Sequence, residues 1–136
     1  MTAKRLLILI GFLLFILTAT LFAHHGGAVE YDMNRTIGPV TGTVTKFAFA
    51  YPHPQVYFDV KGEDGKAQHW GVLLRPTPLM LRNAGWTRES IKSGDAISVT
   101  MYPHKTAPTV GNARRLLING KLLAEDVNRL PGQGPE

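Results

Sequence analysis

The feature that most restricts the fold of this chain is a set of short runs with a strand-like pattern, and apolar and polar residues alternate in those that begin at residues 40, 55 and 96. The runs begin at Val40, Gln55, Ala67, Ala96 and Asn112, and each is followed within a few residues by glycine or proline. Alternation indicates a strand with one buried face, because successive side chains of a strand point to opposite sides. The sequence therefore predicts a mainly β protein.

The first run contains a break in its alternation. Between residues 40 and 49 the large apolar side chains change parity between Val44 and Phe47. This change predicts a β-bulge near Thr45 and Lys46. A bulge bends the strand that carries it, and a long bent first strand is what a small barrel needs in order to close.

The connections between the runs carry turn and helix signals. The sequence "GEDGK" at residues 62–66 predicts a hairpin between the second and third runs, and Asn119-Gly120 predicts a tight hairpin near the end. Between the third and fourth runs, Thr77 can cap a short helix whose first residue is Pro78. A single helix is therefore expected in the middle of the chain.

This order of elements predicts a known architecture. Three strands, one helical connection, two strands and a short extra strand follow the order of the five-stranded Greek-key barrel called the OB-fold. We expect a small OB-fold-like five-stranded antiparallel barrel with one short helix between strands three and four. An open antiparallel β-sandwich is the alternative, which the helix in mid-chain disfavours.

The N-terminal residues have the pattern of an export signal. Lys4 and Arg5 precede the seventeen residues Leu6 to Phe22, which are almost all apolar, and Ala23 is the small residue that an export peptidase needs. We predict a signal peptide over residues 1–23 and a periplasmic or secreted bacterial protein. The alternative is an uncleaved anchor, because seventeen residues is at the short end of the roughly 17–25 that span a bilayer.

The rest of the chain divides into three predicted parts. Residues 24–39 contain glycine and lack either period, so we expect an extended arm. Residues 40–124 form the predicted barrel. Residues 125–136 are polar and rich in proline and glycine, which predicts a flexible tail.

Composition restricts the partners. Cleavage would leave 113 residues, and the loss of Lys4 and Arg5 would lower the formal net charge from +5 to +3, so no nucleic-acid partner is expected. The chain has no cysteine, which excludes disulfides and thiolate metal sites. A membrane is expected as a partner only through the N-terminal segment, if that segment is not cleaved.

Six motifs are distributed along the chain: "HH" after the signal peptide, "EYD", "GTVTKF", a Pro-His pair after the first strand, "GWTRESIKSGD" and "NARRLLINGKLL". Together they resemble a family of small exported bacterial proteins of unknown function. The resemblance runs from His24 to about Leu123, and the combination of Gly85-Trp86-Thr87 with Gly94-Asp95 is its most specific part. It implies export and this fold, and it implies no catalytic residues.

The histidines predict a metal site. If cleavage follows Ala23, the terminal amine and Nδ1 of His24 can chelate one ion. The sequences "YPHP" and "YPHK" place further histidines in the loops after the first and fourth strands, which we expect at one end of the barrel. The predicted ligands are His24, His25, His53 and His104. Copper(II) suits all-nitrogen ligation, and zinc is the second choice.

Each of these features also has a structural explanation. A Pro-His-Pro sequence is a rigid turn with a polar tip, and His25 can be part of a loose arm. His69 beside Trp70 is expected on a sheet face. Phe47 and Phe49 are expected in the core, rather than in a stacking platform for a single-stranded ligand.

The sequence predicts a binding protein and not an enzyme. It contains no Gly-x-Ser-x-Gly elbow, P-loop or His-Glu-x-x-His motif, and the acidic pair Glu63-Asp64 lies in a predicted turn. We expect an exported periplasmic protein that binds copper through His24 and a loop histidine. One alternative is an envelope module that binds a protein or a small ligand without metal, and another is an oxidative copper enzyme.

Overall fold

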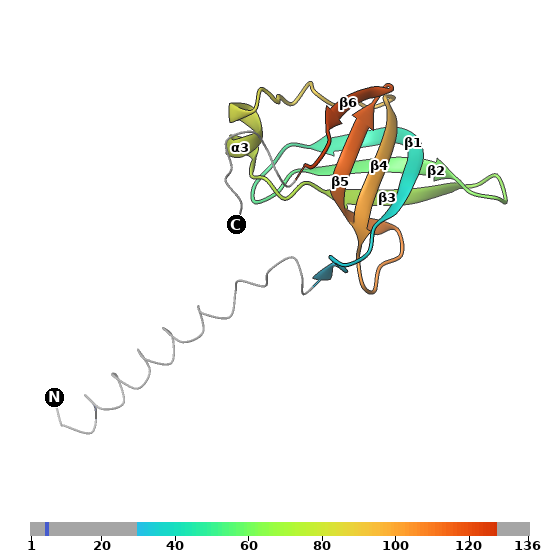
Figure 1. Ribbon diagram of the computed structural model, residues 1–136, viewed down its shortest axis with the longest axis horizontal. Helices are drawn as coiled ribbons and strands as arrows, with labels where there is room; N and C mark the ends of the chain where they lie inside the picture. The colour runs from blue at the N-terminus through green and yellow to red at the C-terminus, as the bar shows by residue number, and fades with distance from the viewer. Residues whose placement is uncertain (1–4, 6–29, 128–136) are drawn as a thin grey trace.

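The computed structural model describes Arg5 and residues 30–127. Within these residues the chain forms six strands and one short helix. In chain order they are β1 (Ile37–Ala48), β2 (Gln55–Lys61), β3 (Ala67–Leu73), α3 (Pro78–Asn83), β4 (Ala96–Pro103), β5 (Val110–Ile118) and β6 (Lys121–Ala124). The predicted order of strands and helix is confirmed (Figure 1).

The strands close into a barrel. The sheet order is β3-β2-β1-β4-β5-β6, and β3 also pairs with β5. This last pairing is parallel, with Gly71 beside Val110 and Leu73 beside Asn112, whereas the other pairings are antiparallel. The barrel of β1 to β5 is therefore mixed and not purely antiparallel as predicted. The cause is the odd number of strands, because when five strands close into a barrel with four antiparallel pairs, the fifth pair must be parallel.

The apolar side chains of the alternating strands fill the barrel, as expected. Val56 and Phe58 of β2 and Ile97, Val99 and Met101 of β4 are each at most 2% exposed, while the residues between them are partly or fully exposed. Burying a side chain of this size contributes about 1.5–3 kcal/mol. The apolar faces of the strands thus account for most of the core.

β1 is long and bent, which allows it to pair with two neighbours. The register between β1 and β2 shifts between Val44 and Lys46, which confirms the predicted bulge. At Gly42 the two strands approach so closely that an added Cβ would lie 2.3 Å from the carbonyl oxygen of Asp59. Only glycine fits this close backbone approach. β1 begins at Ile37, three residues earlier than the sequence indicates, because Ile37 already pairs with Met101.

The predicted helix cap and the predicted tight hairpin are also confirmed. Thr77 caps α3, its hydroxyl accepting a hydrogen bond from the N–H of Met80 at 3.3 Å, and Pro78 begins the helix. Asn119 and Gly120 have φ values of 50° and 75°, as a two-residue hairpin of this type requires. Local sequence therefore determines both connections.

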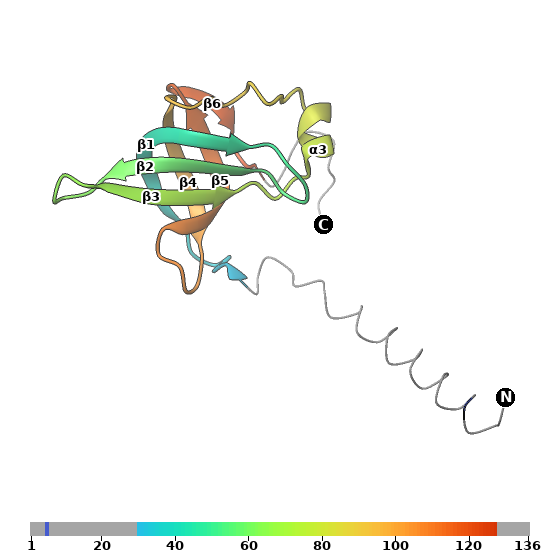
Figure 2. The ribbon, with the colours of Figure 1, turned by 180° about the vertical axis from the view of Figure 1, so that it is seen from behind.

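Residues before and after the barrel are packed against it. Tyr31 is 6% exposed and forms an isolated antiparallel bridge with His104. The segment before β1 lies next to the loop between β4 and β5 (Figure 2). Val127 is fully buried, and its N–H donates to the carbonyl of Arg114. The segments predicted as an arm and a tail thus contribute packed residues. Within the described residues no helix is long and apolar enough to cross a membrane.

Candidate functional site

The two Tyr-Pro-His sequences lie at opposite ends of β1. His53 is in the loop that follows the last residue of β1, Ala48, which pairs with Gln55. His104 bridges Tyr31, which precedes the first residue of β1. The two loops project from different sides of the barrel in both views (Figures 1 and 2). The expectation that both histidines lie at one end of the barrel is wrong, because β4 runs antiparallel to β1.

The ring of His104 is engaged by its own loop. Its Nδ1 accepts hydrogen bonds from the N–H groups of Thr106 at 3.2 Å and Ala107 at 3.1 Å, and the ring meets Tyr31 edge-on at 5.3 Å. An accepting nitrogen carries no hydrogen, so in the neutral ring the hydrogen is on Nε2. A metal ligand uses a free lone pair and donates from its other nitrogen. His104 in this arrangement has no lone pair left for a metal.

His53 has different surroundings. The residue is half-buried, and its Nδ1 is enclosed without a hydrogen-bond partner among the residues that the structure describes. The next residue, Pro54, is buried and accepts a hydrogen bond from the N–H of Leu74. The loop therefore holds His53 by packing rather than by hydrogen bonds to its ring.

The remaining predicted metal ligands, His24 and His25, lie outside the described residues. Among residues 30–127 no group of three or more His, Cys, Asp or Glu side chains is arranged to hold a metal ion. The structure does show where the segment that carries them joins the barrel. The carbonyl of Glu30 accepts from Lys105, and the N–H of Asp32 donates to Pro103. The segment therefore reaches the barrel beside His104 and far from His53.

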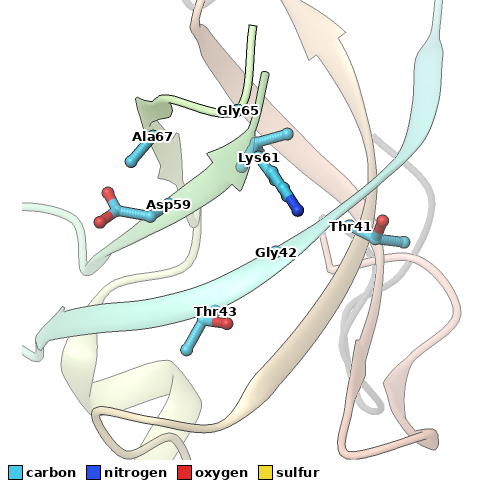
Figure 3. A pocket seen from close by; sticks show the side chains of 8 residues that line it. Thr41, Gly42, Thr43, Asp59, Lys61, Gly65 and Ala67 are labelled. Carbon is cyan, nitrogen blue, oxygen red and sulfur yellow. The ribbon is translucent and has the colours of Figure 1, made fainter. Parts of the chain in front are cut away.

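A second feature is a fork on the outside of the barrel, where β1 and β2 separate. Their ladder ends at the pair Thr43 and Asp59. Before Thr43, β1 pairs with β4, and beyond Asp59, β2 continues with β3 into the projecting hairpin. The gap is an open cavity of about 470 Å³ (Figure 3). We call this cavity the fork; it is lined by Thr41, Gly42, Thr43, Asp59, Val60, Lys61, Gly65 and Ala67.

The side chains of the fork are polar and well separated. Thr41, Thr43 and Lys61 are exposed. The ammonium group of Lys61 points across the gap toward β1, whereas the carboxylate of Asp59 points the opposite way (Figure 3). Lys61 has no ion pair within residues 30–127. The fork thus presents hydroxyl groups and one cation to a ligand.

The outer face of β2 and β3 continues from the fork. His69 is opposite Asp59, and its Nδ1 lies 2.6 Å from Oδ1 of Asp59. Tyr57 is 38% exposed and pairs with Gly71. Its ring lies over this glycine, since two ring carbons are 3.6 Å from the position of an added Cβ. This face of the barrel is the one with which OB-folds bind oligonucleotides and oligosaccharides.

Comparison with known proteins identifies the family. The model of the family of unknown function DUF6152 matches residues 13–113. The chain belongs to DUF6152. None of the curated proteins and none of the solved structures in the comparison matches it. The part matched by the DUF6152 model includes β1 to β4 and therefore every residue that lines the fork.

The fork of this DUF6152 protein was not predicted from its sequence. The outward positions Tyr57, Asp59 and Lys61 are readable from the alternation in β2, and they point away from the core as that alternation predicts. The point at which β1 leaves β2 is not readable in this way, because it depends on pairing between distant segments. His69 is on the sheet face, as predicted, with 85% of its side chain exposed.

The aromatic residues at the end of β1 differ in their burial. Phe49 is 3% exposed, Phe47 packs against the core, and their rings meet edge-on at 5.4 Å. Tyr51 is 64% exposed. The prediction that the two phenylalanines belong to the core is confirmed, and they cannot form a stacking platform.

Proposed function

We propose that this protein is an exported binding module of the bacterial envelope that holds a polar ligand in the fork. The observation that carries the proposal is the open cavity between β1 and β2, which is lined by Thr41, Thr43 and Lys61. The ammonium group of Lys61 points across this cavity (Figure 3) and has no ion pair within residues 30–127. Export is supported by Lys4 and Arg5 before the apolar run, which is the pattern of a signal peptide.

The backbone of the fork adds hydrogen-bonding groups. Residues 40–42 of β1 have a strand neighbour on the β4 side, and residues 60 and 61 of β2 have one on the β3 side. The edges that face each other are outside the β1–β2 ladder. Backbone N–H and C=O groups on such edges need partners from water or from a ligand.

The edges are protected against the addition of a peptide strand. Pro39 has no N–H and interrupts β1 just before the fork, and Lys61 is at the end of β2. Proline and lysine are residues with which natural sheets prevent pairing at an edge. This supports a small polar ligand in preference to an extended peptide.

An NMR titration of the ¹⁵N-labelled exported protein tests the proposal. Glucose, glycerol and acetate serve as polar probes, and we expect shifts of the amide signals of residues 41–43 and 60–61. Replacing both hydroxyl groups by Thr41→Val and Thr43→Val should remove these shifts. Thr45→Val is the matched control, because Thr45 is exposed on β1 and does not line the fork. Shifts clustered elsewhere on the barrel would contradict the proposal.

We propose copper binding at the mature N-terminus as a second function. It is supported by the position of His24-His25 directly after Ala23, because a terminal amine and the imidazole of the same histidine suit copper(II). The hydrogen bonds of Glu30 and Asp32 to Lys105 and Pro103 limit the reach of His24, since the six steps of chain from His24 to Glu30 span at most about 20 Å. The ligands would be the terminal amine and imidazole of His24 together with His25. Neither His53 nor His104 would be needed.

Intact mass spectrometry of the exported protein, with and without Cu(II), tests the second function. We expect cleavage after Ala23 and one copper ion for each chain. One residue added before His24 should abolish copper uptake, whereas one residue added after Glu136 should leave it unchanged. If the protein extended before His24 binds copper as well as its parent does, the N-terminal site is refuted.

A further inference from the structure

The fork is suited to an anionic group. Lys61 directs its ammonium group into the gap, toward the strand that carries Thr41 (Figure 3). Thr41 and Thr43 line the same cavity, and a threonine hydroxyl group can donate a hydrogen bond. Hydrogen bonds from an ammonium group to a carboxylate are about twice as strong as those between neutral groups.

The acidic residue of the fork does not compete for this position. The carboxylate of Asp59 is turned away from Lys61 (Figure 3), and its Oδ1 is 2.6 Å from Nδ1 of His69 on β3. The side chain of Asp59 is 34% exposed, and that of His69 is 85% exposed. The cross-strand pair thus keeps the negative charge on the β3 side and leaves Lys61 available to a ligand.

An aromatic platform lies farther along the same face. Tyr57 and Lys61 point to the same side of β2, and four residues of strand place them about 13 Å apart. The Tyr57 hydroxyl donates to the side-chain carbonyl of Gln55, and the ring lies over Gly71. An aromatic ring that is fixed at its polar tip and partly exposed offers a flat apolar surface.

We infer that the ligand is a short acidic oligosaccharide, which stacks one sugar ring on Tyr57 and places a carboxylate against Lys61. The inference rests on the proposed binding function of the fork. A single sugar cannot span the distance between the two side chains, whereas a short chain can. The alternative of an acidic peptide strand is disfavoured by Pro39 at the edge of the fork.

Isothermal titration with two probes tests the inference. We expect oligogalacturonate, which carries carboxylates, to bind at least about tenfold more tightly than the neutral maltohexaose, as one charge-assisted hydrogen bond allows. Lys61→Gln should abolish this difference. Tyr57→Ala should weaken the binding of both saccharides. Lys66→Gln is the matched control, because Lys66 is in the hairpin turn and pairs with Asp64 at 3.7 Å.

The outcomes separate the inference from the proposed function. Equal affinity for both saccharides at the fork would overturn the acidic ligand and leave the binding function intact. Galacturonic acid that binds as tightly as its oligomer would overturn the role of Tyr57. If neither saccharide binds but other polar probes shift the amide signals of the fork, the saccharide ligand is refuted and the binding function is not. An absence of fork shifts with every probe would overturn both proposals.

Discussion

The two Tyr-Pro-His sequences differ in how the histidine is held, and the difference comes from the residues that follow. After His104, the N–H groups of Thr106 and Ala107 lie in a loop and are free to bond to Nδ1. After His53, the residues two and three positions on are Gln55 and Val56, which already belong to β2 and pair with β1. The same tripeptide therefore becomes a hydrogen-bonded cap in one loop and a packed side chain in the other.

Among the residues beside the two loops, Tyr31 is the one whose substitution should change the free energy of unfolding most. It is 6% exposed and contacts His104, whereas the exposed Tyr51 stands next to the other Pro-His. Tyr31→Ala is expected to lower the free energy of unfolding by about 2–3 kcal/mol, because a buried aromatic side chain is lost. Urea unfolding followed by tryptophan fluorescence measures the change.

Tyr51→Ala is the matched control for this substitution. Tyr51 is 64% exposed, so the expected change in the free energy of unfolding is below about 0.5 kcal/mol. Equal losses in the two variants would show that Tyr31 does not fasten the N-terminal segment to the barrel in solution.

Loss of the cap formed by His104 should cause the next largest decrease in the free energy of unfolding. His104→Ala removes the acceptor for two N–H groups that water can reach in part, and we expect a loss of about 1 kcal/mol in the free energy of unfolding. His104→Asn should recover part of this loss, since an asparagine side chain accepts from the N–H two residues on. If alanine and asparagine destabilise equally, the imidazole contributes by packing and not by its hydrogen bonds.

Much of the fold was predictable because local rules determine it. The bulge after Val44, the cap at Thr77 and the hairpin at Asn119-Gly120 each depend on a few adjacent residues. The parallel pairing of β3 with β5 was not predicted, because it joins Gly71 to Val110 across a long connection. Pairing of this kind depends on closure of the whole barrel.

The candidate site was less predictable than the fold. Single residues such as His53 and Lys61 could be assigned to a loop or a strand face, but their neighbours could not. The direction of β4 relative to β1 determines that His104 meets Tyr31 and not His53. The fork depends in the same way on where β1 leaves β2, a property of the register rather than of any motif.

Alkaline pH should distinguish Tyr31 from an exposed tyrosine. Burial, and then the negative charge of Glu30, raise the pKa of Tyr31 above its ordinary value of 10.0. The unfolded chain therefore loses this proton first, so the contribution of Tyr31 to stability is complete below pH 10 and declines as the pH rises further. Tyr31→Phe should lose less stability than the parent between pH 9 and 11.

Tyr51→Phe is the comparison for this pH series. It should follow the alkaline decline of the parent protein, because Tyr51 is largely exposed. Urea unfolding at each pH gives both curves. A parallel decline in all three proteins would show that the ionisation of Tyr31 is not linked to folding.

The smallest effect is expected at His53. Its Nδ1 is enclosed without a partner among the described residues, and an unpaired buried nitrogen reduces stability. His53→Ala removes this nitrogen together with the packing of a half-buried ring, and the two changes oppose each other. We expect the free energy of unfolding to change by less than about 0.5 kcal/mol. A loss as large as that in His104→Ala would mean that the enclosed Nδ1 does not offset the packing of the ring.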